Sequence, residues 1–415
     1  MSDLLRSAMS ARLAKLPMDL PPLTADEEAE LEDEESDDAL GALPGGGYSG
    51  LGPPAIPRQV GSNRDTKSKP KPPNPDFAPI SGASYFSEAL QVAVPARQLD
   101  CRVYYTPPKK ANGTVLVCHH GAGYGGLSFA CLAKELVGMS RGEVGVLSAD
   151  ARRHGKTKST TETEDEDLSI GVLVEDFVQT LRAVWSDAGA APTLLLVGHS
   201  MGGSVVTRSV TPLLDAGYRV SGVAVLDVVE GTAIDALPHM HSLLNARPDG
   251  FDSVEAAVEW HVKTKTIRNA LSARVSVPGI VVPSSSASTP SGSSATESST
   301  TAPTGTGGTG SPHAYVWRTP LRSTAAYWQG WFTGLSASFL SARTARLLLL
   351  AGTDRLDREL MIGQMQGKFQ MVVVPGVGHV LHEDDPTHVA EVLLEFYRRN
   401  DRLRMPAKVK GVGEA

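Results

Sequence analysis

Six short apolar runs, each about the length of one buried strand, alternate along the chain with segments of helical periodicity. The runs are TVLVCHH (114–120), EVGVLSAD (143–150), TLLLVG (193–198), VSGVAVLD (220–227), ARLLLLAG (345–352) and QMVVVPG (370–376). Apolar residues at helical spacing occupy 127–141, 168–188, 200–216, 357–368 and 386–400. Uninterrupted apolar strands that alternate with helices are typical of a parallel sheet covered on both faces. The sequence therefore predicts an α/β fold, with CRVYY (101–105) as an antiparallel strand near its start.

Low-complexity sequence precedes and interrupts this pattern. Residues 1–75 contain an acidic run, a Gly/Pro-rich stretch and a basic Pro-rich stretch, and such a composition buries too little apolar surface to offset the entropy of ordering. Residues 284–311 are almost entirely Ser, Thr, Gly, Ala and Pro, which predicts a flexible insert in a surface loop. We therefore expect a disordered tail over 1–75, a folded domain over 76–400 and a C-terminal tail over 401–415.

The span 231–340 departs from the alternation, between the fourth and fifth of the parallel strands. It holds the helical pattern SVEAAVEWHVKT, the flexible insert and the aromatic piece YWQGWFTGL. Ligands bind at the carboxyl ends of the strands in open α/β sheets. We therefore expect a helical cap over the site, inserted between the strand that ends near 227 and the strand that starts near 345.

Charge and cysteine usage exclude several classes of protein. The net charge of −7 arises from residues 26–38, which carry ten acids and no base, so that the rest of the chain sums to +3. A nearly neutral body offers no nucleic-acid footprint, and no apolar run approaches the roughly 18–20 residues of a membrane span. The three cysteines, Cys101, Cys118 and Cys131, are an odd number, which favours a reducing compartment over a disulfide framework. We expect a protein of the cytoplasm or nucleus with neither nucleic acid nor membrane as its partner.

The segment GHSMG (198–202) fits the pattern G-x-S-x-G, and it follows a predicted strand and opens a predicted helix. In that context the pattern predicts a sharp turn that exposes a serine nucleophile above the sheet. Gly198 and Gly202 remove side chains that would clash across the turn, and the helix N-terminus favours negative charge. Ser200 is therefore the candidate nucleophile.

A serine nucleophile needs a base, and the base needs an acid that orients it. His379 follows the last strand and a Gly-rich turn, which is where the base is expected, whereas we expect His382 to be structural. Asp354 and Asp227 each follow a predicted strand, so both could reach the imidazole, and Asp357 is a weaker third candidate. The residues alone leave the acid open.

An oxyanion hole needs two backbone amides. Met201, the residue after the nucleophile, supplies one, and the loop HHGAGYGG (119–126) supplies the other, with Ala122 as the expected donor. The loop DARRHGKT (150–157) follows the next strand and resembles a loop common in α/β hydrolases. We expect this second loop to be part of the scaffold.

Several segments together resemble the protein phosphatase methylesterase family of α/β hydrolases. They are GHSMGG, LDVVEGTAIDAL, EWHVKTKTIRNALSARVSV, YWQGWFTGLS, LLLLAGTDRLDREL, IGQMQGKFQM and GHVLHEDDP, and the resemblance covers roughly 75–400 apart from 284–311. This family removes the methyl ester from the C-terminal leucine of the protein phosphatase 2A catalytic subunit. The insert at 284–311 is low in charge, unlike the corresponding loops of the family, and the acidic run has no counterpart there.

The resemblance implies a function and completes the catalytic set. The chain would be a serine carboxylesterase with an α/β-hydrolase fold, acting through an acyl-enzyme on Ser200, with the phosphatase catalytic subunit as substrate and partner and with no metal or cofactor. The aspartate of the family's D-V-V-E-G segment corresponds to Asp227, which the resemblance therefore implies as the acid. Two alternatives stay open: a general small-molecule carboxylesterase, and a non-catalytic protein that binds the phosphatase.

Side chains of the predicted cap carry two further expectations. Four aromatic residues suit a pocket for an apolar chain end, although packing within the cap would explain each of them as well: Trp260, Trp328, Trp331 and Phe332. Arg268 and Arg274 face either acidic groups of a partner or solvent.

Overall fold

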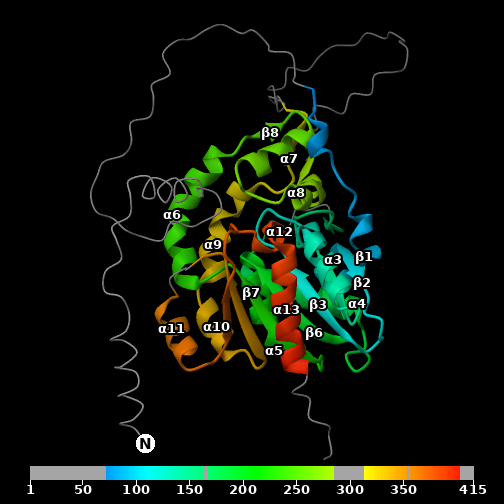
Figure 1. Cartoon of the computed structure of the whole chain (residues 1–415), viewed down its shortest axis with the longest axis vertical. Coiled ribbons are helices and arrows are strands. Elements are labelled where there is room, and N and C mark those ends of the chain that lie inside the picture. Colours follow the sequence, from blue (N-terminus) through cyan, green and yellow to red (C-terminus); the bar gives the residue numbers. More distant parts are fainter. Residues whose placement is uncertain (1–71, 162–166, 285–312, 353–355, 402–415) are drawn as a thin grey trace, which may run out of the picture. The chain divides into compact units, whose positions relative to one another are not determined.

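The computed structural model of the chain describes residues 72–161, 167–284, 313–352 and 356–401 (Figure 1). The predicted tails and the predicted insert lie almost entirely outside these ranges. So does Asp354, one of the three candidates for the catalytic acid.

One nine-stranded sheet runs through the described residues in the order β1-β2-β4-β3-β6-β7-β11-β12, with β5 paired to β2. Neighbours from β4 to β12 are parallel, and β1 and β2 are antiparallel to their neighbours. The α/β fold and the antiparallel strand around 101–105 are thus confirmed. The strands are β1 (Glu88–Val94), β2 (Leu99–Thr106), β3 (Thr114–His119), β4 (Val144–Ala149), β5 (Lys158–Ser159), β6 (Thr193–His199), β7 (Val220–Leu226), β11 (Ala345–Leu350) and β12 (Gln370–Val373).

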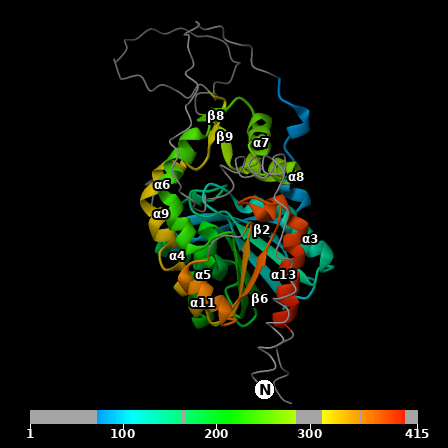
Figure 2. The ribbon, with the colours of Figure 1, turned by 60° about the vertical axis from the view of Figure 1, so that its left-hand side comes forward.

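Helices cover both faces of this sheet. Figure 2 shows α3 and α13 on one side and α4 and α5 on the other. Each layer buries its own apolar side chains, such as Leu132 and Phe396 on one face and Phe177 and Val205 on the other. The helices are α3 (Ala130–Met139), α4 (Ile170–Val184), α5 (Met201–Asp215), α11 (Arg358–Met365), α12 (Leu381–Asp384) and α13 (Pro386–Asp401).

The register of the parallel strands brings three loops to one edge. His119, at the end of β3, lies opposite Gly198 of β6, and His199 of β6 lies opposite Leu226 of β7. Leu226 in turn lies opposite Leu349 of β11. Because parallel strands end at the same edge of the sheet, the segments that follow β3, β6 and β7 begin side by side.

The segment between β7 and β11 forms the cap, and it is not wholly helical. It contains α6 (Glu230–Ala246), α7 (Val254–Lys263), α8 (Ala270–Ser276), α9 (Ala325–Phe332) and α10 (Leu335–Ser341). A small antiparallel sheet, which we did not predict, joins β8 (Gly250–Phe251), β10 (Tyr315–Trp317) and β9 (Val281–Pro283). Strands of two or three residues are too short to show alternation. Edge strand β1 was also missed, because it is exposed along most of its length.

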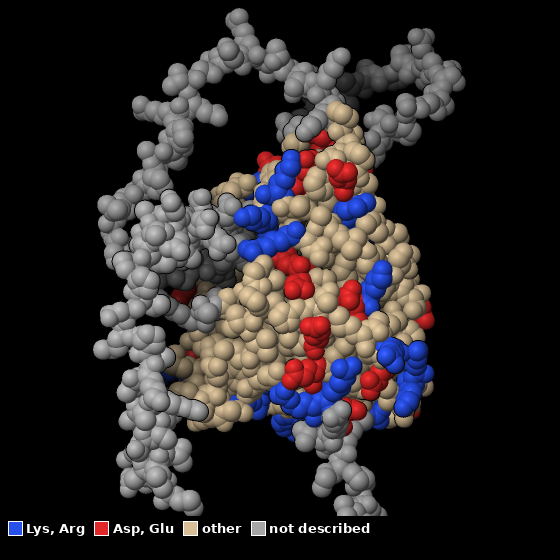
Figure 3. Space-filling model, in the orientation of Figure 1, with Lys and Arg blue, Asp and Glu red and all other residues tan. Residues whose placement is uncertain are grey.

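The described surface carries both signs of charge. On the face shown in Figure 3, Lys and Arg are interspersed with Asp and Glu. Within the described ranges, no helix has both the length and the apolarity that a membrane span requires.

The cap is tied to the segment that carries His379. Val380 is buried in the small hydrophobic core of the cap, together with Ile267 and Val277. Asp384 accepts a hydrogen bond from the amide of Arg268 in the cap at 2.7 Å and another from the amide of Gly378 at 2.8 Å. The position of the residues on either side of His379 therefore depends on the cap.

Both arginines that we expected to face a partner or solvent instead bond within the chain. The Arg268 guanidinium donates to the carbonyl of Gly376 at 3.0 Å, and that of Arg274 donates to the carbonyl of Ala78 at 2.7 Å. Each side chain therefore helps to hold the cap in place.

Glu383, four residues after His379, is fully buried against helix α8 of the cap. The hydroxyl of Ser276 donates to its Oε2 at 2.5 Å, and the hydroxyl of Ser272 donates to its backbone carbonyl at 2.7 Å. Desolvation by burial raises the pKa of Glu383 to about 8, against the opposing effect of the Ser276 hydrogen bond. The carboxyl group is therefore protonated in the folded protein at neutral pH.

We predict that Glu383→Gln removes part of the pH dependence of stability. The pKa of about 8 in the folded state exceeds the ordinary value of 4.5, so between these values the folded protein holds a proton that the unfolded chain has lost. The free energy of unfolding should therefore fall as pH rises through this window, by at most about 1.4 kcal/mol per pH unit. Urea unfolding from about pH 5 to about pH 8 measures the slope.

The variant cannot ionise at this position, so its slope should be flatter than that of the wild type. Glu395→Gln is the matched control, because the Glu395 side chain is 64% exposed on α13, and it should keep the wild-type slope. Equal slopes for wild type and Glu383→Gln would contradict the buried, protonated carboxyl group.

Candidate active site

Ser200 lies in a strained turn between β6 and α5. Its φ of 51° is in the left-handed region, which is costly for a residue other than glycine. A Cβ at Gly198 would come within 2.2 Å of the carbonyl oxygen of Gly202, and a Cβ at Gly202 would come within 2.2 Å of the carbonyl oxygen of His119. Only glycine fits these two positions, so the sequence forces the sharp turn that presents Ser200 at the N-terminus of α5.

Asp227 follows β7 and faces His379. Its amide donates to the carbonyl of Leu349 at 2.7 Å, and its Oδ1 accepts from the amide of Ala351 at 2.7 Å. Its Oδ2 is 2.7 Å from Nδ1 of His379, and its side chain is only 9% exposed. The carboxylate is thus held by two strands of the sheet, and one oxygen remains to orient the imidazole.

Asp357 does not take this place. Its Oδ1 accepts from the amide of Leu360 at 2.9 Å and so caps helix α11, and its Oδ2 accepts from the hydroxyl of Ser336 at 2.5 Å. Both oxygens are therefore engaged away from His379. Among the described residues, Asp227 is the carboxylate that contacts the candidate base.

The backbone of His379 is held by a second histidine, which sequence reasoning missed. Nε2 of His199 lies 2.8 Å from the carbonyl oxygen of His379, and because a carbonyl only accepts, this nitrogen carries the proton. Burial, reinforced by the nearby His379 and His382, holds the pKa of His199 well below its usual value. His199 therefore stays neutral and adds no positive charge beside the base. The one feature of the sequence that could have pointed to His199 is its position directly before the nucleophile.

His382 has a packing role, as expected. It is fully buried, and its ring centroid lies 4.4 Å from that of Phe129 and 4.7 Å from that of His199. Burial lowers the pKa of His382 to about 3, with a further contribution from His379. A neutral imidazole of this kind fills the space behind His199 rather than exchanging protons with substrate.

Two buried histidines shape the loop that carries Ala122. The amide of Gly123 donates to Nε2 of His154 at 3.0 Å. Nδ1 of His120 lies 2.7 Å from the carbonyl oxygen of Gly121, and its Nε2 accepts from the amide of Ala151 at 3.0 Å. Both histidines accept through Nε2, so both must be neutral, and burial lowers the pKa of His154 to about 4 and that of His120 well below its usual value.

The loop 150–157 forms the support behind the Ala122 loop, in agreement with its expected scaffold role. Asp150 accepts from the amides of Gly126 at 2.6 Å and Lys156 at 2.7 Å. Arg152 forms a buried, bidentate pair with Asp176 of helix α4, at 2.6 and 2.8 Å. Such two-point contacts fix orientation as well as distance.

The amides of Met201 and Ala122 are available as oxyanion donors. Both residues line the pocket that contains Ser200, and within the described part of the chain neither amide donates to another group. The neighbouring amide of Gly123 is already used by His154. Both expected donors are thus open to a ligand.

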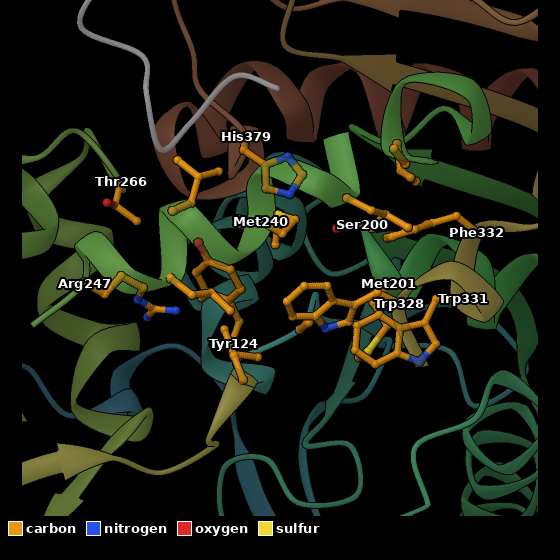
Figure 4. Close-up of a pocket in the computed structure, with 18 of the residues that line it drawn as sticks. Tyr124, Ser200, Met201, Met240, Arg247, Thr266, Trp328, Trp331, Phe332 and His379 are labelled. Carbon is orange, nitrogen blue, oxygen red and sulfur yellow. The ribbon is translucent and has the colours of Figure 1, made fainter. Parts of the chain in front are cut away.

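The pocket itself is mostly apolar, and Figure 4 shows Ser200 and His379 on its wall. All four aromatic residues singled out in the cap contribute to the lining. Two of them are also held by hydrogen bonds within the protein. Nε1 of Trp331 donates to the carbonyl of Leu168 at 2.7 Å, and Nε1 of Trp328 donates to the hydroxyl of Thr324 at 2.8 Å. The lining residues are Ala122, Gly123, Tyr124, Ser200, Met201, Val228, Ala233, Leu237, Met240, Leu243, Leu244, Arg247, Trp260, Thr266, Ile280, Leu321, Trp328, Trp331, Phe332 and His379.

Ser200 and His379 share this pocket, yet the Ser200 hydroxyl donates no hydrogen bond to any described residue. Catalytic hydrogen bonds are often long in the absence of substrate and shorten when it binds. Within the same ranges, no three His, Cys, Asp or Glu side chains gather in the way a metal site requires.

The chain is similar in sequence to methylesterases and in fold to other hydrolases. A model of the α/β hydrolase family matches residues 116–392. Protein phosphatase methylesterase 1 of Cryptococcus neoformans var. neoformans is 41% identical over 100% of this chain and 96% of its own length. The protein of the same name from Aspergillus oryzae is 40% identical over 99% of this chain and 93% of its own.

Solved structures agree on the fold. The structure of E-2-(acetamidomethylene)succinate hydrolase has a TM-score of 0.55 at 17% identity, covering 75% of this chain and 99% of that one. An M. tuberculosis esterase has a TM-score of 0.50 at 17% identity, covering 75% of this chain and 92% of its own. The fold, the G-x-S-x-G turn and the full-length sequence similarity agree, and the chain belongs to the protein phosphatase methylesterase family of α/β hydrolases.

Proposed function

We propose that this chain is a serine carboxylesterase that removes the methyl ester from the C-terminal leucine of the protein phosphatase 2A catalytic subunit. The observation that carries the chemistry is the 2.7 Å contact between Nδ1 of His379 and Oδ2 of Asp227, beside the strained turn of Ser200. The similarity to methylesterases over the full chain supports the choice of a phosphatase as substrate.

Acylation begins with the tautomer that Asp227 selects. The carboxylate accepts a hydrogen bond from Nδ1–H of His379 and keeps the proton on that nitrogen, which leaves the lone pair on Nε2 for the Ser200 hydroxyl. As Oγ attacks the ester carbonyl, Nε2 takes its proton, and the amides of Met201 and Ala122 stabilise the oxyanion. The imidazolium then returns this proton to the departing methoxide, and methanol leaves.

Deacylation repeats the same steps with water. Nε2 of His379 takes a proton from the water that attacks the acyl-enzyme, and the proton passes to Oγ of Ser200 when the tetrahedral intermediate collapses. The products are the free carboxylate of the leucine and the regenerated enzyme. No residue outside this set has to change its protonation state.

The lining of the pocket suits the terminal leucine. Leu237, Met240, Trp328 and Phe332 offer apolar surface in the pocket that holds Ser200. Each fully buried leucine side chain contributes about 1.5–3 kcal/mol relative to water, which would select an apolar residue at the reacting end.

The proposed cellular location follows from the substrate and from the cysteines. The phosphatase catalytic subunit would be both substrate and partner, in the cytoplasm or the nucleus. Cys101, Cys118 and Cys131 are free thiols in buried positions, which suits a reducing compartment.

We predict that Ser200→Ala abolishes demethylation without unfolding the protein. The change removes the only atom that forms the acyl bond, and it leaves the glycines of the turn in place. The assay uses intact, carboxymethylated phosphatase catalytic subunit and follows loss of the methyl ester by mass spectrometry, with the melting temperature as a check on folding.

Ser204→Ala is the matched control for this experiment. Ser204 lies one turn further along α5 and is fully buried, and its hydroxyl has no hydrogen-bond partner among the residues that the structure describes, so its replacement should leave demethylation intact. Demethylation by folded Ser200→Ala would rule out Ser200 as nucleophile. Wild-type hydrolysis of short nitrophenyl esters without demethylation would retain the serine chemistry and make the protein a general carboxylesterase.

We also predict that Asp227→Asn lowers kcat/KM by roughly 10³–10⁴-fold, because an amide no longer stabilises the imidazolium or selects its tautomer. Asp357→Asn is the control, since Asp357 caps α11 away from the site. Asn caps a helix about as well as Asp, so this change should cost less than about 1 kcal/mol of stability and leave the activity of the folded enzyme within a few-fold. A larger loss of activity in Asp357→Asn than in Asp227→Asn would show that Asp227 is not the catalytic acid.

A further inference from the structure

One side chain that lines the pocket is charged, whereas the others are apolar or uncharged at neutral pH. Among the described residues that line it, Arg247 is the only arginine or lysine, and no aspartate or glutamate accompanies it. Figure 4 shows Trp331 and Phe332 on one side of Ser200 and Arg247 on the opposite side, beyond Tyr124. The pocket thus has an aromatic end and a cationic end, with the nucleophile between them.

The guanidinium of Arg247 is held in place by an aromatic ring. Its central carbon lies 3.7 Å from the centroid of the Trp317 ring, within the range of a cation–π contact. Nε1 of Trp317 donates to the carbonyl of Pro248 at 2.7 Å, and the ring packs edge-on against Phe251 with centroids 5.2 Å apart. Arg247 directly follows α6, so both its backbone and its guanidinium plane are fixed by the cap.

The charge of Arg247 has no partner of opposite sign in the described part of the chain. No carboxylate there lies within ion-pair distance of it, and Asp249, two residues on, is instead 3.6 Å from Arg322. The neighbouring Tyr124 is neutral, because burial raises the pKa of its hydroxyl. Arg322 adds like charge, so the groups around Arg247 leave its charge uncompensated.

Partial burial of Arg247 makes its uncompensated charge costly for the free enzyme. Desolvation lowers the pKa of Arg247, yet a guanidinium stays protonated in proteins. An anion that enters the pocket would recover the lost interaction and would gain a bidentate hydrogen bond. Arg247 lines the pocket, and within the described part of the chain its guanidinium donates no hydrogen bond, so its donors are available to a ligand.

We propose that Arg247 binds an acidic side chain of the substrate, upstream of its esterified terminus. This inference rests on the proposed function, in which the terminal carboxyl group is an uncharged ester placed at Ser200, so the anion must come from a preceding residue. The chain would run from the aromatic end past Ser200 towards Arg247, which also borders a second hollow lined by Pro248 and Arg322. Arg247 is thus a specificity residue for acidic C-terminal segments.

The test compares charge in the substrate with charge at position 247. Peptides that end in leucine methyl ester carry either Asp or Asn at each of the upstream positions in turn, and kcat/KM is measured for wild type, Arg247→Met and Arg247→Lys. At one position, wild type should prefer Asp over Asn by roughly tenfold or more. Arg247→Met should bring this ratio close to one, and Arg247→Lys should restore part of it.

Arg343→Met is the matched control, because it removes an exposed positive charge outside both hollows and should keep the preference. The Kd values of the Asp and Asn peptides are also compared in the Ser200→Ala background. This comparison detects the preference even if the peptides are turned over slowly. No preference in wild type, or a preference that survives in Arg247→Met, would overturn the inference.

Different results bear on the role of Arg247 and on the proposed function. Hydrolysis of the esters without charge preference would reject only the role of Arg247. An intact, carboxymethylated phosphatase subunit that keeps its methyl ester in the presence of wild-type enzyme would reject the proposed function, whatever the peptides show.

Discussion

The hydrogen bond between His379 and Asp227 is the contact on which the rest of the site depends. The carboxylate is positioned by the sheet, through the Leu349 carbonyl and the Ala351 amide, whereas the imidazole arrives on a loop held by His199. These are separate parts of the fold, and they meet at 2.7 Å. A small displacement of either residue would break the contact that orients the imidazole, and the surrounding hydrogen bonds hold both residues in place.

Buried, uncharged imidazoles support both the base and the loop of the oxyanion donors. His120 and His154 shape the loop of the oxyanion donors, and His199 and His382 lie behind the base. Burial disfavours their protonated forms, so they support the site without placing charge beside the reaction. The cap completes the support, because Asp384 bonds to the amides of both Gly378 and Arg268. The cap is therefore connected to the segment that carries the base.

Local sequence was enough to predict the parts of the site that are built locally. Gly198, Ser200 and Gly202 act within one turn, and the apolar runs predicted the parallel strands. The acid could not be derived in this way, because several aspartates follow strands and only the order of strands in the sheet brings Asp227 to His379. That residue was identified through the resemblance to the methylesterases.

Other features depend on residues far apart in sequence. Ser276 and Glu383 are separated by 107 positions, and nothing in either segment indicates their hydrogen bond. Arg247 is an ordinary arginine in the sequence, and only its place over Trp317 in the pocket marks it as unusual. Strand β1 and the small sheet of the cap were missed because exposed or very short strands show no apolar pattern.

The most direct test of the account is to find which atom a serine-directed fluorophosphonate modifies. Full-length wild type, His379→Ala and Ser204→Ala are treated in parallel, and the modified peptide is mapped by mass spectrometry. We expect a single adduct on Ser200 in wild type and in Ser204→Ala, and almost none in His379→Ala, because the hydroxyl is activated only by the oriented imidazole. An adduct on another residue, or equal labelling of Ser200 without His379, would contradict the account.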